Sequence, residues 1–174
     1  MQKISPFLWF NDQAEAAAKF YVSVFKKGST KGSTKDSKII QIARYGDAGP
    51  GPKGSVMTVA FRLAGMDLTA LNGGPHFKFT PAISLVVSCA TQKEIDTLWQ
   101  KLSSVPAAEQ CGWLVDKYGL SWQIVPTFIG EVMASKDAAK ANRVMAALLP
   151  MKKLDLAKLK QAAAPVARKR KTKG

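Results

Sequence analysis

The chain has 174 residues, of which 47% are hydrophobic, and a formal net charge of +14. This composition supports a packed core and excludes a wholly disordered chain. No run approaches the roughly 18 uninterrupted apolar residues of a membrane helix, and the N-terminus lacks a secretory signal pattern, so we expect a cytoplasmic protein without a membrane contact.

Much of the positive charge lies near the C-terminal end. Nine of the 26 basic residues and one of the 12 acidic residues lie from Pro150 onward, which leaves +6 on residues 1–149. The tail 165–174 is a block of like charges, and we predict that it is disordered. A nucleic-acid-associated module acting through this tail is an alternative function, because Lys and Arg neutralise phosphates. The rest of the chain has no groove-reading motif, so we expect no nucleic-acid partner.

The first half of the chain predicts the order β-α-β-β-β. The strands are predicted over 4–10, 39–45, 56–63 and 66–71, the last two forming a hairpin across Ala64-Gly65. A helix is predicted over 13–25, with Asn11-Asp12 as its cap. Residues 27–35 hold a tandem KGST repeat without apolar residues, so we expect a flexible surface loop there.

The second half repeats this order. Residues 82–88 predict a strand, and Thr91 with Glu94 three positions later forms a capping box for a helix that ends near 103. Residues 111–126 predict a hairpin around the turn 116–119, in which Asp116 caps its own backbone and a glycine supplies a positive φ. A hairpin flanked by two tryptophans must pack on another part of the molecule.

Residues from Phe128 onward favour helices broken at two prolines. Their apolar residues are candidates for covering an edge of a partner subunit. The predicted division is a domain over 1–130 with modules at about 1–73 and 80–127, a helical extension over 131–164, and a basic tail over 165–174.

Two tandem βαβββ modules are typical of the vicinal-oxygen-chelate, or glyoxalase/bleomycin resistance/dioxygenase, superfamily. Specific strings resemble its PhnB-like branch: SPFLWF at 5–10, EAA through FY at 15–21, LNGGPHFKFT at 71–80, and the hairpin 111–126. The resemblance covers about 2–130. It implies an α+β fold with a small-molecule cleft, and a homodimer whose cavities lie near the interface.

The PhnB-like branch often carries the label 3-demethylubiquinone-9 3-methyltransferase. A Rossmann-type methyltransferase needs a glycine-rich turn between a strand and a helix. The glycine clusters at 49–54 and 73–74 instead lie between strand-like segments, with prolines that prevent a helix from starting there. We therefore expect no cofactor, and whether the protein is an enzyme stays open.

The resemblance also places Ser5, Ala82 and Gln123 at metal-ligand positions, with a fourth position near Asn72. A catalytic metal needs about three protein donors. Ala82 has no donor atom and Ser5 is a poor ligand, so we expect no metal. A metal-dependent lyase or dioxygenase of the same fold is the alternative.

Alternation along the strands predicts which residues line the cavity, because residues two positions apart face the same side. The candidate ligand-binding residues are Ser5, Phe7, Trp9, Asn72, His76, Ser84, Ser121 and Gln123, with Val86 and Val125 beside them. The residues predicted to pack under the helices are Leu8, Phe10, Ile83, Leu85, Trp122 and Ile124. Aromatic walls with hydroxyls and an amide suit a neutral or aromatic small molecule.

Two of these assignments have alternatives. Phe7 and Trp9 can instead fill the cleft as core residues. His76, the only histidine, lies in the loop between the modules and can instead be a structural hydrogen-bonding group.

Two further residues carry side chains capable of nucleophilic or acid–base chemistry. Cys111 and Asp116 have no base or orienting partner near them in sequence. Asp116 is explained by the turn, and Cys111 by apolar packing. Because Cys89 and Cys111 have no zinc-site spacing, we expect reduced thiols.

Overall fold

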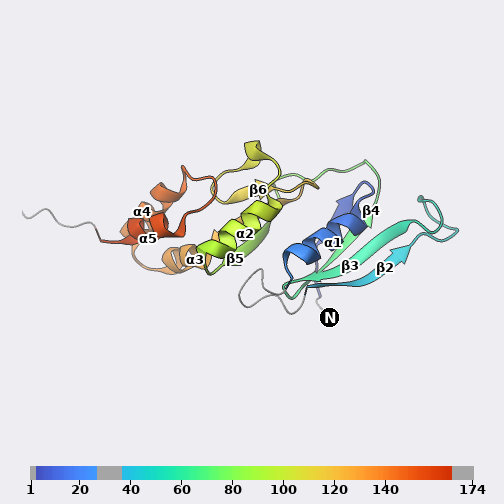
Figure 1. Cartoon of the computed structure of the whole chain (residues 1–174), viewed down its shortest axis with the longest axis horizontal. Helices are drawn as coiled ribbons and strands as arrows, with labels where there is room; N and C mark the ends of the chain where they lie inside the picture. The colour runs from blue at the N-terminus through green and yellow to red at the C-terminus, as the bar shows by residue number, and fades with distance from the viewer. Residues whose placement is uncertain (1–2, 27–36, 166–174) are drawn as a thin grey trace, which may run out of the picture.

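The computed structural model describes residues 3–26 and 37–165 (Figure 1). The predicted KGST loop and nearly all of the predicted basic tail lie outside these ranges. The strands are β1 (Phe7–Phe10), β2 (Lys38–Arg44), β3 (Val56–Leu63), β4 (Met66–Asn72), β5 (Leu85–Cys89), β6 (Trp113–Val115) and β7 (Ser121–Pro126). The helices are α1 (Ala14–Val24), α2 (Gln92–Leu102), the 3-10 helix η2 (Pro106–Ala108), α3 (Thr127–Ala134), α4 (Ala138–Leu148) and α5 (Leu156–Ala163).

Module one has the predicted β-α-β-β-β order along the chain, and its strands form a sheet in the order β1-β4-β3-β2. β1 runs parallel to β4, while β4 and β2 are antiparallel to β3. The turn between β3 and β4 has positive φ at both Ala64 (49°) and Gly65 (88°). This mirror-image turn matches the twist of a two-residue hairpin, so the predicted hairpin is confirmed.

The cap of α1 differs from the prediction. The N-cap position is Gln13 and not Asn11 or Asp12, and the Gln13 side chain makes no capping hydrogen bond. The backbone N–H of Ala14 instead donates to Oδ1 of Asn72 at 2.8 Å, and Nδ2 of Asn72 donates to the carbonyl of Val56 at 3.0 Å. One side chain at the end of β4 therefore caps α1 and holds β3.

Module two has a sheet of three strands in the order β5-β7-β6, so its described residues form one strand fewer than the predicted βαβββ order. The capping box of α2 is confirmed, since Thr91 accepts from the N–H of Glu94 and the Glu94 side chain accepts from the Thr91 N–H. β5 begins at Leu85, three residues later than predicted, and Ile83 is 75% exposed. Ile83 therefore does not pack under the helices, because it precedes the strand whose alternation would have turned it inward.

The turn of the β6–β7 hairpin is built on a buried carboxylate. Asp116 is 1% exposed and accepts hydrogen bonds from the N–H groups of Tyr118 and Leu120 and from Nε1 of Trp122. Burial raises the pKa of Asp116 although these bonds favour the ionised form. The nearby Tyr21 hydroxyl is buried without a hydrogen-bond partner of ordinary geometry in the described part of the chain. Burial first, and then the Asp116 charge, raise the pKa of Tyr21.

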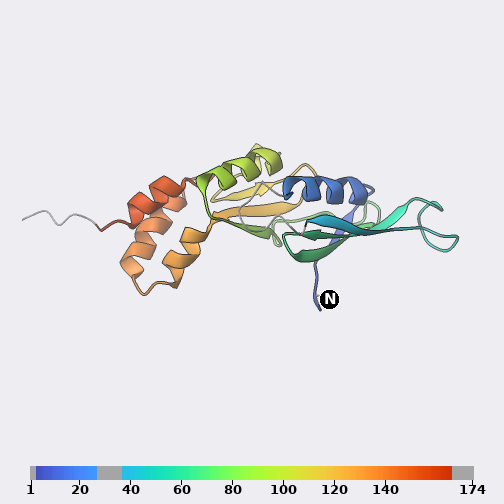
Figure 2. The ribbon, with the colours of Figure 1, turned by 60° about the horizontal axis from the view of Figure 1, so that its bottom comes forward.

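The two sheets share a helix-covered face and an uncovered one. Figure 2 shows α1 and α2 on the same side of the sheets. The predicted core residues Leu8, Phe10, Trp122 and Ile124 are buried on the covered side. We call the opposite side the open face. By strand alternation it includes Phe7, Trp9, Thr69 and Leu71 in module one, and Val86, Ser88, Trp113, Val115, Ser121, Gln123 and Val125 in module two.

Helices α3 to α5 form an extension on the far side of module two from module one (Figure 1). It begins at Thr127 and has its own apolar core, which includes Val132, Val144 and Leu159. The Gln92 side chain at the start of α2 bonds to the carbonyl of Leu154 and the N–H of Leu156. In the described ranges no helix is both long and apolar enough to cross a membrane.

Candidate functional site

The module-one half of the open face is aromatic and rigidly held. Phe7 is 60% exposed, so it does not fill a core within this chain. The Trp9 ring meets the Phe77 ring edge-on, with centroids 4.9 Å apart, and its Nε1 donates to the Gly74 carbonyl at 2.9 Å. A Cβ on Gly73 would lie 2.3 Å from the Trp9 ring, so only glycine allows this approach.

The module-two half carries the polar groups of the open face. Nε2 of Gln123 donates to the Ser84 hydroxyl at 2.9 Å, which links β7 to the residue before β5. Val86 is 59% exposed beside this pair. Ser121 is the first residue of β7 and is only 2% exposed.

Ser121 belongs to a pocket of about 620 Å³, which we call the β6 pocket. Its walls come from β6, β7, the segment around η2 and the loop before β5. The lining residues are Pro81, Ala107, Ala108, Gln110, Cys111, Trp113, Leu114, Val115 and Ser121. Sequence reasoning identified Ser121 and missed Gln110, because the segment 103–111 has no periodic signal. It also missed Trp113, although Trp113 pairs with Gln123 across the hairpin and therefore lies on the same face.

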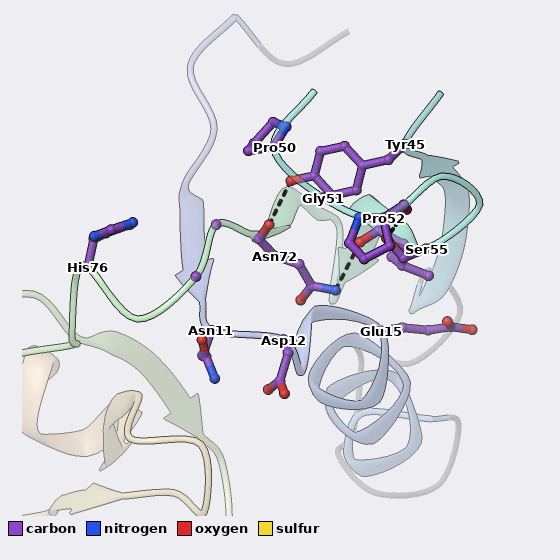
Figure 3. A pocket seen from close by; sticks show the side chains of 13 residues that line it. Asn11, Asp12, Glu15, Tyr45, Pro50, Gly51, Pro52, Ser55, Asn72 and His76 are labelled. Atoms are coloured by element: carbon purple, nitrogen blue, oxygen red, sulfur yellow. Dashed lines mark hydrogen bonds between the residues drawn. The ribbon is translucent and has the colours of Figure 1, made fainter. Parts of the chain in front are cut away.

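A second pocket, of about 520 Å³, lies at the end of β4, and we call it the loop pocket (Figure 3). The loop 46–54, the start of α1 and the segment 72–76 surround it. Figure 3 shows the Tyr45 hydroxyl bonded to the Asn72 carbonyl, at 2.9 Å, and His76 on the other side of Asn72 from the loop. A Cβ on Gly51 would lie 2.3 Å from the Tyr45 ring, so the loop closes tightly over this ring.

The polar groups of the loop pocket are largely committed to the fold. The Asn72 amide holds α1 and β3, as described above. A hydrogen bond from Lys19, at 2.6 Å between Nζ and Oε1, lowers the pKa of Glu15. His76 is exposed and makes no hydrogen bond within the described ranges.

The structure therefore distributes the predicted ligand-binding residues over several places. Asn72 and His76 line the loop pocket, and Ser121 lines the β6 pocket. The others lie outside both pockets: Phe7, Trp9, Ser84 and Gln123 on or beside the open face, and Ser5 exposed before β1. No single cavity of this chain's described residues brings all eight together.

The metal-ligand positions do not form a donor set. Ala82 has no donor atom, Ser5 is exposed, and the Gln123 amide is bonded to Ser84. The residues that the structure describes include no group of three or more His, Cys, Asp or Glu side chains placed to hold a metal. These residues do not fit the catalytic metal of the superfamily.

The strand-to-helix connections also do not fit a Rossmann-type binding site for a methyl-donor cofactor. β1 leads into α1 through Asn11, Asp12 and Gln13, and β5 leads into α2 through Ala90 and Thr91. Neither connection contains the glycine that lets a backbone approach a nucleotide cofactor. The glycine-rich segments follow β2 and β4 and lead to no helix directly.

A comparison with protein-family profiles matches residues 2–125 to the family described as 3-demethylubiquinone-9 3-methyltransferase. The match ends within β7, so α3 to α5 lie beyond it. A comparison with curated protein sequences finds no match.

Among solved structures, the chain is similar to a Bacillus cereus protein described as a PhnB protein and assigned the name 3-demethylubiquinone-9 3-methyltransferase. The two share 39% identity over 72% of this chain and 99% of that chain, with a TM-score of 0.56. A Pseudomonas aeruginosa protein shares the fold, with 17% identity, coverage of 72% and 98%, and a TM-score of 0.53. A glyoxylase/bleomycin resistance protein/dioxygenase domain from a Frankia species aligns at 14% identity, with coverage of 72% and 92% and a TM-score of 0.43.

Proposed function

The chain belongs to the PhnB-like family of the glyoxalase/bleomycin resistance/dioxygenase superfamily, and from this membership we propose that it binds an uncharged small molecule on its open face. The observation that carries the proposal is the uncovered, aromatic and apolar sheet surface beside a pocket of about 620 Å³. Pockets of this size and lining hold drug-sized ligands.

We further propose that a second copy of the chain covers the open face. Phe7 and Val86 project from it with 60% and 59% of their surface exposed. Large apolar side chains exposed on an uncovered sheet face are typical of an interaction surface. A two-fold dimer would bring the open faces of two copies together and enclose ligand cavities between them.

We infer that ligand binding in this protein proceeds without a bound metal. The three superfamily ligand positions support this inference, because Ala82 has no donor atom, Ser5 is exposed and the Gln123 amide is bonded to Ser84. The methyltransferase name of the family does not extend to a proposal of methyl transfer, because neither strand-to-helix connection fits a nucleotide cofactor.

Native mass spectrometry and sedimentation of Val86→Asp and Leu149→Asp test the dimer. Leu149 is the matched control, because it is also 59% exposed but lies in the extension. We expect a wild-type dimer that Val86→Asp converts to monomer and Leu149→Asp leaves intact. A monomeric wild type, or equal effects of the two substitutions, would refute the proposed interface.

The same spectra test ligand binding. We expect an organic adduct, or binding of the neutral dye Nile red, that Val86→Asp weakens and Leu149→Asp does not. Stoichiometric metal retained by the purified protein would contradict the proposal that ligand binding proceeds without a bound metal.

A further inference from the structure

We propose that the β6 pocket is a binding site for an uncharged, largely apolar small molecule held between Trp113 and Ser121, with the Cys111 thiol at the rim. The inference rests on the proposed function, because the pocket lies on the module-two half of the open face. It adds the place and the chemical class of the ligand.

The lining of the pocket determines the charge of its ligand. All nine lining residues are neutral: three alanine or proline residues at the outer wall, and Gln110, Cys111, Trp113, Leu114, Val115 and Ser121 on and next to the sheet. A charged ligand group buried among them would have no counter-ion. Because burying an unpaired charge is strongly unfavourable, the pocket selects against charged molecules.

Ser121 supplies the polar contact. It is 2% exposed, and its hydroxyl makes no hydrogen bond among the described residues. Its neighbour Trp122 points under the helices, so Ser121 points to the opposite side of the sheet, where it lines the pocket. Among the described residues the buried side-chain atom without a partner is the Tyr21 hydroxyl, so the Ser121 hydroxyl is open to the pocket. A ligand with a carbonyl or hydroxyl group can form a hydrogen bond with it there.

The pocket has length as well as polarity. Ser121 pairs with Val115 in the sheet, while the Gly112 carbonyl accepts from the N–H of Ile124, three residues further along β7. At about 3.4 Å per residue, the Ser121 and Cys111 ends are roughly 10 Å apart. Trp113 lies between them, which suits one aromatic ring and a short substituent.

Cys111 is held at the rim by the extension. Its φ is +53°, a conformation that a non-glycine residue adopts only under constraint. The constraint comes from the segment after α4, since the Cys111 N–H donates to the Met151 carbonyl at 2.7 Å and the thiol donates to the Leu149 carbonyl at 3.2 Å. The thiol is partly exposed.

Cys111 is also a specific reporter of the pocket. The other cysteine, Cys89, is fully buried, and burial raises its pKa to about 12. A thiol reagent applied to the folded protein therefore reacts at Cys111 and leaves Cys89 unmodified.

The test compares three methanethiosulfonates with the same reacting group: a neutral benzyl reagent, an anionic sulfonatoethyl reagent and a cationic trimethylammonioethyl reagent. The thiolate forms a disulfide with the sulfenyl sulfur, and methanesulfinate leaves. Rates at Cys111 are followed by intact-mass spectrometry and divided by the rates with glutathione. We expect the benzyl reagent to be at least about tenfold faster than both charged reagents after this correction. We also expect its rate to saturate with concentration, because it binds before it reacts.

Variants locate the binding. Trp113→Ala should weaken saturation by the benzyl reagent threefold or more, while Ser88→Ala, on the open face outside the pocket, should not. Cys111→Ser should abolish labelling by all three reagents. Equal corrected rates for the three reagents, or a benzyl rate that stays linear in concentration and is unchanged in Trp113→Ala, would overturn the inference.

Nile red binding, measured on the same samples, separates this inference from the proposed function. If the dye binds wild type but benzyl labelling shows no saturation, the open face binds molecules elsewhere and only the pocket assignment is wrong. If neither the dye nor the benzyl reagent binds, the proposed function is refuted as well.

Discussion

Replacing Asp116 tests the account of the β6–β7 hairpin. In Asp116→Ala the indole of Trp122 and the N–H of Leu120 lose their acceptor while buried, and the N–H of Tyr118 loses it while partly buried. Each buried donor without a partner costs about 1–3 kcal/mol. Removing a buried carboxylate recovers part of this, so we expect a net loss of about 2–4 kcal/mol in the free energy of unfolding.

Asp116→Asn separates the hydrogen bonds from the charge. The amide oxygen can still accept from the two backbone N–H groups, while its NH₂ group faces the indole N–H of Trp122. One donor loses its acceptor but no charge is buried, so we expect a cost within about 1–2 kcal/mol at pH 7. Asp137→Ala is the matched control, because Asp137 is exposed and accepts one N–H at the start of α4. It should cost about 0.5–2 kcal/mol.

The pH dependence has a definite sign. Burial raises the folded-state pKa of Asp116 above its ordinary value of 3.8. The stability that the protonated group contributes is full below 3.8 and is lost as pH rises through the raised folded value. The cost of Asp116→Asn relative to wild type should therefore be larger at pH 4.5 than at pH 7.

Urea denaturation of the three variants, followed by circular dichroism and by tryptophan fluorescence at both pH values, gives these free energies. The reasoning fails if Asp116→Ala costs no more than Asp137→Ala. It also fails if the cost of Asp116→Asn grows as pH rises, because the hydrogen bonds would then outweigh burial.

Four further substitutions, one of them a control, test the packing. Gly51→Ala would place a Cβ 2.3 Å from the Tyr45 ring and should lower the free energy of unfolding by about 1–3 kcal/mol, measured by thermal or urea unfolding. Gly46→Ala is the control, because its Cβ would meet open space, and it should change the free energy of unfolding by less than about 1 kcal/mol. Equal effects of the two substitutions would refute the loop packing. Gly130→Ala, inside α3 and in open space, should stabilise by about 0.5–1 kcal/mol, and a lower melting temperature would contradict this. Gln92→Ala removes the Gln92 side-chain bonds to the extension and should speed proteolytic release of α3 to α5, seen by mass spectrometry. An unchanged cleavage rate would show that the Gln92 bonds do not hold the extension in place.

The fold was predictable because its signals are local. The capping box at Thr91, the turn around Asp116 and the Ala64-Gly65 hairpin each lie within a few residues, and each is confirmed. The cap of α1 was not predictable in this way. Asn11 and Asp12 have the right chemistry, but the acceptor comes from Asn72, which is 58 residues away.

The site was less predictable, because its walls come from segments that are far apart in the sequence. Strand alternation correctly separated Leu8, Phe10, Trp122 and Ile124 from the open face. Alternation gives the side of a sheet and not the position of a covering loop. The walls around Tyr45 and Trp113 depend on where the segments 46–54 and 103–111 cross, and neither segment has a period.

The cap that Asn72 provides has a consequence for synthesis of the chain on the ribosome. Helix α1 leaves the exit tunnel well before Asn72, the residue that caps it. Strand β1 also emerges before β4, its parallel partner. At about 5–20 residues per second, the 58-residue interval lasts roughly 3–12 s. During that time α1 lacks its cap and β1 lacks its partner strand, and only β2 and β3 are available to pack against the helix, so nascent chains stalled before β4 should be clients for chaperones. The later hairpin, whose partners are adjacent, closes as soon as it emerges.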